Sequence, residues 1–184
     1  MNEQTNPGWR NNVNVLYSKE ELQTRIAALG SEITQSYSPD TELIMIGILK
    51  GCFLFYGDLI RSIDLPLECE FMGISSYGSD TKSSGVVQIT SDLTRSIEGK
   101  DVIVVEDIVD TGLTMRYLLD NFETRRPKSL RVCTLLDKKA RRTKTVHVDY
   151  VGYSIPDKFV VGYGLDYAGK YRNLPFIGVY HGDK

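Results

Sequence analysis

Cysteine and histidine are scarce in this chain of 184 residues, which contains three cysteines and two histidines. The cysteines lie far apart, at Cys52, Cys69 and Cys133, and neither His147 nor His181 belongs to a Cys/His cluster. An odd number of scattered cysteines predicts neither a disulfide framework nor a zinc site. The cysteine usage is therefore that of a protein in the reducing cytoplasm.

Long apolar runs and a strong excess of one charge are also missing. No apolar run approaches the ~20 residues that span a membrane. The N-terminal sequence, MNEQTNPGWRNN, lacks the basic segment and the apolar stretch of a secretory signal. A net charge of −2 provides no general attraction to nucleic acid or to an anionic membrane. We therefore expect a cytoplasmic protein with neither nucleic acid nor a membrane as its partner.

What the chain does contain is an alternation of apolar runs and helical patterns. Ser18 and Glu21 predict a capping box at the start of a helix, and the run ELIMIGIL over 42–49 is typical of a strand buried on both faces. Strands that alternate with helices predict a single α/β domain over 1–184, with a mainly parallel central sheet flanked by helices and with residues 1–12 loosely ordered. The remaining expected elements are a helix over 52–63, strands over 67–75 and 85–90, a strand from 101 followed by a helix with Met115, Leu118, Leu119 and Phe122 on one face, and strand-like segments over 129–139, 148–156 and 158–166.

The segment 102–114, VIVVEDIVDTGLT, carries the strongest chemical signal. Four apolar residues lead to two adjacent acids, Glu106 and Asp107, at the end of the expected strand. Residues Asp110–Thr114 then predict a tight turn into a helix, where backbone N–H groups and two threonine hydroxyls can point at one phosphate. The acids suit a neighbouring diol or a metal ion. Solvated acids before an ordinary capped helix would give a similar pattern, but the complete string is more specific than that.

This string resembles the phosphoribosyl pyrophosphate (PRPP) signature of the type I phosphoribosyltransferases. As a whole, the chain is similar to the bacterial hypoxanthine-guanine branch of that family. The resemblance implies the type I phosphoribosyltransferase fold, with a small hood and a flexible active-site loop. It also implies a Mg²⁺-dependent purine salvage enzyme, a glycosyltransferase that moves the 5-phosphoribosyl group from PRPP to hypoxanthine or guanine and gives IMP or GMP and pyrophosphate. Further matches, in family order, are Leu49-Lys50-Gly51, the Ser75–Val87 loop, LLDKKARR and IPDKFVVGYGLDYAGKYRNLP.

The same resemblance implies roles for individual residues in purine recognition. Asp110 corresponds to the group near the purine N7, where it handles the ring proton as a general base or acid; as a plain turn aspartate it would have no such role. Lys138 corresponds to the lysine that contacts the 6-oxo group. Phe159 corresponds to the aromatic ring that stacks on the base, although a phenylalanine that opens a strand is more often a core residue.

A second group of roles concerns PRPP and the metal. In the family, the Leu49–Lys50 peptide bond is cis and the turn binds pyrophosphate through its backbone, while the loop opened by Ser76 and Tyr77 closes over the reacting centre and excludes water. The implied set is Asp110 as the catalytic residue; Lys50, Gly51, Ser76, Tyr77, Glu106, Asp107, Asp110, Thr111, Gly112, Leu113, Thr114 and Arg172 for PRPP and pyrophosphate; Lys138, Phe159, Val160 and Asp166 for the purine; and Glu106, Asp107 and Asp166 for Mg²⁺.

The basic residues that follow Lys138 leave an alternative open. We interpret Lys139, Arg141, Arg142 and Lys144 as a solvated basic face, but they are also the one feature that favours an RNA- or DNA-binding regulator built on the same fold. A relative that prefers xanthine or a pyrimidine is the other alternative, and Phe159 and Lys138 argue against the pyrimidine version. The family resemblance further implies a homodimer or a homotetramer.

Overall fold

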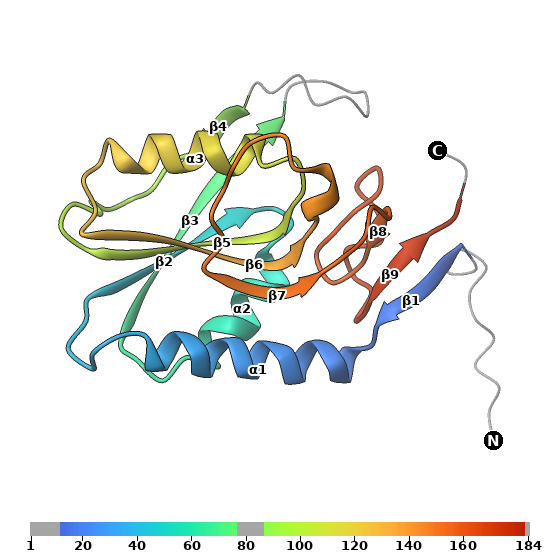
Figure 1. The fold of residues 1–184 in the computed structure, drawn as a ribbon, viewed down its shortest axis with the longest axis horizontal. Coiled ribbons are helices and arrows are strands. Elements are labelled where there is room, and N and C mark those ends of the chain that lie inside the picture. The colour runs from blue at the N-terminus through green and yellow to red at the C-terminus, as the bar shows by residue number, and fades with distance from the viewer. Residues whose placement is uncertain (1–11, 77–86, 183–184) are drawn as a thin grey trace.

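The structure is a computed structural model that describes residues 12–76 and 87–182 (Figure 1). Its largest element is a six-stranded sheet with the strand order β4-β3-β2-β5-β6-β7, and a second, three-stranded sheet has the order β1-β9-β8. The elements are β1 (Val13–Tyr17), α1 (Lys19–Gln35), β2 (Leu43–Leu49), α2 (Phe53–Ile60), β3 (Leu67–Ser76), β4 (Val87–Ser91), β5 (Asp101–Val109), α3 (Leu113–Glu123), β6 (Ser129–Asp137), the 3₁₀ turn Lys139–Arg141, β7 (Tyr150–Ser154), β8 (Val160–Val161) and β9 (Ile177–Tyr180).

The large sheet is parallel except at one edge. Strands β3, β2, β5, β6 and β7 pair in parallel, and β4 pairs with β3 in the antiparallel sense. The chain leaves β2 toward β3 on one side and leaves β5 toward β6 on the other, so the topology reverses between β2 and β5. In open α/β sheets, the crevice at the carboxyl ends of such strands is where ligands bind. The functional site is therefore expected beyond the ends of β2 and β5.

Helices cover both faces of this sheet. In Figure 1, α1 and α2 lie along one face and α3 lies along the other. The side chains of β2 alternate between the two cores, with Met45 among the residues under α1 and α2, and Ile44 and Ile46 among those under α3. Because both faces are buried, the central strands have no polar side, which explains the continuous apolar runs in the sequence. The expected alternation of strands and helices is confirmed.

The first helix begins as its sequence predicts. The Ser18 backbone N–H donates to Glu21 Oε2 at 2.7 Å, and the Glu21 N–H donates to Ser18 Oγ at 3.2 Å, which together form the capping box. The helix buries Leu22, Ile26 and Leu29 along one side. The second helix is shorter than the predicted 52–63, because it ends at Ile60.

The small sheet joins segments from the two ends of the described chain. Strand β1 pairs in the antiparallel sense with β9, which in turn pairs with β8. Of the expected strand over 158–166, only Val160–Val161 is a strand, and beyond it Gly162 and Gly164, with φ angles of 98° and 101°, turn the chain back. Among the helices of the described residues, none is both long and apolar enough to cross a membrane.

Candidate active site

A large cavity lies between the carboxyl ends of the central strands and the small sheet. Its volume is ≈ 870 Å³. Residues from the ends of β5 and β6 form one wall, and residues from β8 and the segment after it form the other. The lining residues are Asp107, Ile108, Asp110, Lys138, Arg141, Phe159, Val160, Leu165, Asp166 and Tyr167.

A smaller cavity of ≈ 290 Å³ adjoins the large one and shares Ile108 and Asp110 with it. The turn before α3 forms most of its wall. Gly112 has a φ angle of 82° and stands at the N-cap position of α3, where it has no side chain to accept from the first turn. The Leu113 N–H makes only a long bond, 3.4 Å, to Thr111 Oγ1, and the start of α3 adds the positive end of the helix dipole, so this turn can attract an anion. The predicted phosphate cradle thus lies at the start of a helix that borders a cavity, and its role stays a prediction.

The paired acids at the end of β5 carry unbalanced charge. Glu106 Oε2 is buried and has no hydrogen-bond partner within the described residues, and burial raises the pKa of this carboxyl well above its usual range. Burial also raises the pKa of Asp107 to about 6, although the N–H of Ile108, 2.9 Å away, and the charge of Arg172 act in the opposite direction. Burial thus opposes the charged form of both carboxyls, and a cation bound beside them would favour that form.

Three chain segments meet behind Asp107 with almost no space between them. A Cβ atom added at Gly51 would lie 1.7 Å from Asp107 Oδ2, and one added at Gly164 would lie 2.1 Å from the Gly51 carbonyl oxygen. Only glycine fits at either position. The peptide bond between Leu49 and Lys50 is cis, as the family resemblance suggested. The turn after β2, the end of β5 and the small sheet are thereby held in direct contact at the site.

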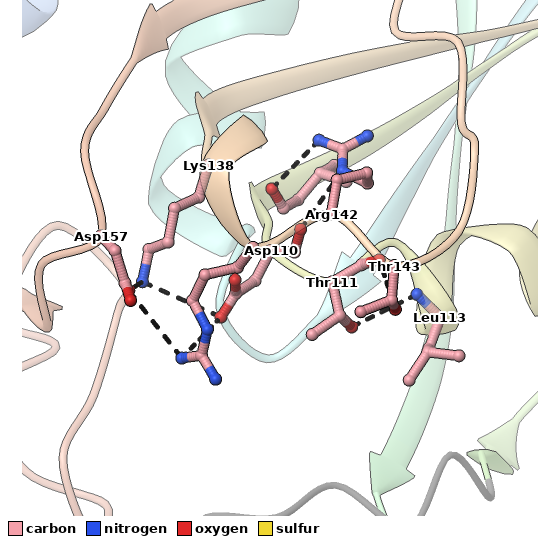
Figure 2. A network of polar contacts seen from close by, with 9 residues as sticks. Asp110, Thr111, Leu113, Lys138, Arg142, Thr143 and Asp157 are labelled. Carbon is pink, nitrogen blue, oxygen red and sulfur yellow. Dashed lines mark hydrogen bonds and ion pairs between the residues drawn. The ribbon is translucent and has the colours of Figure 1, made fainter.

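A cluster of four charges occupies the floor of the large cavity (Figure 2). Lys138 is 5% exposed, and its Nζ lies 3.8 Å from Asp110 Oδ2 and 3.6 Å from Asp157 Oδ1. Arg141 Nη1 is shared between the same two carboxylates, at 3.6 and 3.9 Å. The other oxygen of Asp110, Oδ1, is buried without a hydrogen-bond partner in the part of the chain that is described. A carboxylate with one free oxygen beside a buried lysine can exchange a proton with a ligand that the lysine orients.

The basic segment after Lys138 corrects one sequence-based interpretation. Lys139 and Lys144 are exposed, as a solvated face requires, but the Arg142 side chain is only 16% exposed and forms an ion pair with the buried Asp137. Arg141 lines the cavity and pairs with Asp110. The interpretation as a solvated face is therefore wrong for Arg142, whereas the exposed Arg141 combines contact with solvent and ion pairs to Asp110 and Asp157. The feature that favoured a nucleic-acid-binding regulator is correspondingly weakened.

The segments on either side of β8 contribute an aromatic and an ionic group near the opposite wall. Phe159 is 36% exposed, and its ring lies edge-on to Tyr167 with the centroids 5.6 Å apart. Asp166 Oδ1 is 2.6 Å from Arg172 Nη2, and Arg172 Nη1 donates to the Gly164 carbonyl at 2.5 Å. Phe159 is thus a partly exposed residue that lines the cavity rather than a core residue.

Most of the residues named from the sequence come together at these two cavities. Ser76 ends β3, and its side chain, like the whole of Tyr77, lies outside the described residues. Sequence reasoning missed Asp157, Leu165 and Tyr167. Asp157 lies two residues before Phe159, in a segment that the family resemblance covers. Its place in the sequence could therefore have indicated that it belongs to the site. The three acids assigned to the metal do not form a protein-only site, because the described residues contain no group of three or more Asp, Glu, His or Cys side chains that could hold an ion.

Comparisons with known proteins show that this chain is similar to phosphoribosyltransferases. The phosphoribosyl transferase domain family matches residues 13–168 of the chain. The hypoxanthine-guanine phosphoribosyltransferase of Bacillus subtilis is 52% identical over 165 residues, which are 90% of this chain and 91% of the relative. A hypoxanthine phosphoribosyltransferase structure from Staphylococcus aureus has a TM-score of 0.90 at 45% identity and covers 96% of both chains. The Trypanosoma cruzi hypoxanthine phosphoribosyltransferase in complex with the product IMP has a TM-score of 0.86 at 42% identity, covering 92% of this chain and 95% of that one. These similarities confirm the expected fold.

Proposed function

The chain belongs to the phosphoribosyltransferase family, and on that premise we propose that it is a purine salvage enzyme that transfers the 5-phosphoribosyl group from PRPP to hypoxanthine and to guanine. The observation that carries the proposal is the junction of the two cavities at Asp110. One cavity has the backbone N–H groups that a phosphate requires, and the other has a buried lysine and an aromatic ring. IMP, the product in the Trypanosoma cruzi complex, has one group for each cavity.

PRPP is assigned to the smaller cavity and the adjoining strand ends. The 5′-phosphate binds at Thr111–Thr114, where the start of α3 supplies N–H groups and hydroxyls. The hydroxyls of the ribose donate to Glu106 and Asp107, whose carboxylates have unused acceptor capacity. The pyrophosphate lies against the Leu49–Gly51 turn and Arg172, whose planar guanidinium suits phosphate oxygens. Ser76 and Tyr77 would cover the reacting centre from the loop.

The acids in this region fit a Mg²⁺ ion that arrives with its substrate. Mg²⁺ prefers oxygen ligands and usually combines one or two carboxylates with substrate phosphates. The unpartnered oxygen of Glu106 and the raised pKa of Asp107 support their assignment to the metal, directly or through water, with Asp166 as a third acid across the cavity. When bound, Mg²⁺ neutralises the charge of the pyrophosphate leaving group.

The purine is assigned to the larger cavity. Lys138 has three N–H donors and no acceptor, so its buried ammonium group is complementary to the 6-oxo group that hypoxanthine and guanine share. Phe159 stacks on the ring, and the backbone of Val160 and the side chain of Asp166 lie toward the opposite edge of the base. Asp157 Oδ1 lies 3.6 Å from Lys138 Nζ and orients the ammonium group that meets the 6-oxo group.

The chemical step needs positioning and one proton transfer. As N9 of the base bonds to C1′ of the ribose, the bond from C1′ to the pyrophosphate oxygen breaks and the base loses one ring proton. Asp110 is assigned as the group that accepts this proton at N7, because it lines the cavity and its Oδ2 lies 3.8 Å from Nζ of the lysine that orients the base. Holding the two reactants in line supplies most of the remaining acceleration.

A direct assay tests this function. The protein is incubated with PRPP and Mg²⁺ and with hypoxanthine, guanine, xanthine, adenine or a pyrimidine in separate reactions, and nucleotide and pyrophosphate are quantified. We expect IMP and GMP with stoichiometric pyrophosphate. Turnover of a pyrimidine alone, or of no base, would contradict the proposal. Nucleic-acid binding in a salt series separates the regulator alternative, since phosphate contacts weaken steeply with salt.

The proposed setting of the reaction is the cytoplasm, where PRPP and free purine bases are available to an enzyme with no helix able to span a membrane among its described residues. A homodimer or a homotetramer is proposed on the family resemblance alone. Sedimentation of the purified protein at several concentrations tests the assembly.

A further inference from the structure

Arg142 makes more polar contacts around the candidate site than its sequence position suggested. Its Nε donates to the Asp110 carbonyl oxygen at 3.2 Å, its Nη2 to the Val109 carbonyl at 3.4 Å and its Nη1 to the Val146 carbonyl at 3.4 Å. The same guanidinium forms an ion pair with Asp137, which is 2% exposed. We call residues 110–114, which lead into α3, the PRPP turn. One planar cation therefore joins the start of this turn to the end of β6 (Figure 2).

The residues beside Arg142 cover the back of the same turn. The N–H groups of Thr143 and Lys144 donate to the Thr111 carbonyl oxygen at 2.9 and 3.1 Å. A Cβ atom at Gly112 would lie 2.8 Å from Arg142 Cδ and 2.7 Å from the Lys144 carbonyl oxygen, so the turn and the segment are in close contact. The segment 142–144 thus supports the turn on one side, while Thr111, Gly112 and Thr114 line the smaller cavity.

Arg142 also reaches the purine side through the chain next to Lys138. The Lys138 N–H donates to the Val109 carbonyl oxygen at 3.0 Å, and Arg142 donates to that same oxygen. Asp137, the ion-pair partner of Arg142, is the residue directly before Lys138. The guanidinium is therefore bonded both to the backbone of the catalytic aspartate and to the neighbour of the purine-reading lysine.

We propose that Arg142 is a positioning residue that holds the PRPP turn and Lys138 in one register, so that the phosphate and purine sites keep the spacing that the reaction needs. The inference rests on the proposed function. Arg142 contacts no substrate itself in this arrangement, because its donors are directed at main-chain carbonyls and at Asp137. Its fork geometry matters as much as its charge, since no other side chain presents five donors in one plane.

Two variants separate positioning from simple stabilisation. Arg142→Lys keeps a cation against Asp137 but cannot reach three carbonyls at once. The double variant Arg142→Gln with Asp137→Asn removes both charges, so no unpaired carboxylate is left buried. For both, we expect a melting temperature close to that of the parent, together with a Kd for PRPP·Mg²⁺ that is raised about 10- to 100-fold in calorimetry and a kcat that falls with it.

The control is Lys139→Gln, which removes the other cation beside Asp137. Lys139 Nζ lies 3.7 Å from Asp137 Oδ2, and its side chain is 75% exposed and makes no contact with the PRPP turn in the described structure. We expect the Kd for PRPP·Mg²⁺ to stay within about twofold of the parent, a change of roughly 0.4 kcal/mol. If Lys139→Gln weakens PRPP as much as the Arg142 variants do, charge at Asp137 is the cause and the positioning role is overturned.

The remaining outcomes are also decisive. If either Arg142 variant folds and binds PRPP as the parent does, the positioning role is overturned and Arg142 is a stabilising residue only. If both variants fail to fold, the coupling of the two sites cannot be separated from fold stability, which overturns the proposal as stated. The parent protein in the same titration separates a failure of the proposed function from a failure of this inference. If the parent does not bind PRPP, the proposed function is contradicted. If the parent binds PRPP and the variants bind it equally well, only the positioning role of Arg142 is contradicted.

Discussion

At the scale of single residues, the site depends on charges that the ligand-free chain leaves partly unpaired. Asp110 has one oxygen near two cations and one buried oxygen without a partner among the described residues. Glu106 also has a buried oxygen without a hydrogen-bond partner among these residues, and burial opposes the charge on Asp107. Such arrangements are destabilising in a protein without ligands, and they persist at sites that bind or react.

Asp110→Asn tests the proton transfer. The amide keeps the size of the side chain and its place beside Lys138, but it cannot accept a proton. General acid–base assistance contributes ~10²–10⁴-fold, so we expect kcat to fall by about that factor with little change in the Kd for PRPP. The measurement is steady-state kinetics with hypoxanthine, accompanied by calorimetry. A variant within twofold of the parent kcat would remove Asp110 from the chemistry.

Lys138→Gln tests how the base is chosen. Adenine carries an amino group at position 6, so it would present a donor to the donors of Lys138, and the parent should show negligible activity with it. Glutamine offers both an acceptor and donors. We expect kcat/KM for hypoxanthine and guanine to fall about 10-fold or more, since a hydrogen bond to a charged group is worth roughly 1.5–3 kcal/mol. The advantage over adenine should narrow; an unchanged ratio of hypoxanthine to adenine would show that another group reads position 6.

Asp107→Asn links the site to pH-dependent stability. The pKa of Asp107 is raised from 3.8 to about 6, so the folded protein binds this proton more tightly than the unfolded chain does. The stability that depends on the proton is therefore fully present below about pH 4 and is lost as the pH rises through about 6. Removing the charge should therefore stabilise the variant relative to the parent at pH 8, by up to about 3 kcal/mol, and by less at pH 5. Urea unfolding at both pH values gives the comparison. A difference that is the same at pH 5 and pH 8 would contradict the raised pKa.

At the scale of elements, the site is built from the places where strands stop and helices start. The turn into α3 needs a residue with positive φ and no side chain, and the sequence provides Gly112. The same requirement makes the 110–114 string recognisable in the amino-acid sequence. The ends of β2 and β6 can be predicted from the sequence as easily, because each buried apolar run stops at a polar residue.

Gly112→Ala tests this element. The φ angle of 82° and the carbonyl oxygen of Lys144, 2.7 Å from a new Cβ, both oppose the methyl group. Strain of this kind is worth about 1–3 kcal/mol, so we expect lower stability and weaker PRPP binding together. Gly57→Ala is the matched control, because Gly57 lies inside α2 and a Cβ there meets nothing within 4 Å. It should stabilise the protein by about 0.5–1 kcal/mol and leave binding unchanged; equal loss in both variants would contradict the proposed role of the turn.

At the scale of the whole molecule, two sheets enclose the cavity, and the chain passes between them more than once. The small sheet combines β1, from near the N-terminus, with β8 and β9, from near the C-terminus (Figure 1). Its contact with the large sheet runs through Gly164, Gly51 and Asp107. A ligand that binds across this contact should therefore tie the two sheets together.

Metal-dependent stabilisation by PRPP tests that expectation. With PRPP·Mg²⁺ at about 100 times its Kd, mass action stabilises the folded protein by about 2.7 kcal/mol, which corresponds to a rise in Tm of roughly 5–11 °C for a chain of this size. Excess chelator should abolish both the shift and turnover, because Glu106, Asp107 and Asp166 would then repel the diphosphate. Calorimetric scans with and without chelator provide the measurement. Full turnover in chelator would contradict the metal requirement.

The sequence by itself predicted the buried parallel strands, the tight turn over 110–114 and the residues that are proposed for the site. These features are local, because a strand buried on both faces, a capping box and a glycine with positive φ each leave their pattern within a few neighbouring residues. Asp110, Glu106 and Asp107 could therefore be named from one continuous string. The family resemblance then connected that string to Lys138 and Phe159.

Tertiary structure alone decided how the distant parts meet. The strands β1 and β9 are short and lie far apart in the chain, so nothing local predicts their pairing, and the run 158–166 turns back after Val161 because Gly162 and Gly164 adopt positive φ. Arg142 looks like any exposed arginine in the sequence, and only the folded chain brings it to the carbonyls of Val109 and Asp110 and to Asp137. The physical reason is the same in each case. No local sequence pattern indicates which segments will contact each other, because these contacts form only once the sheets have packed.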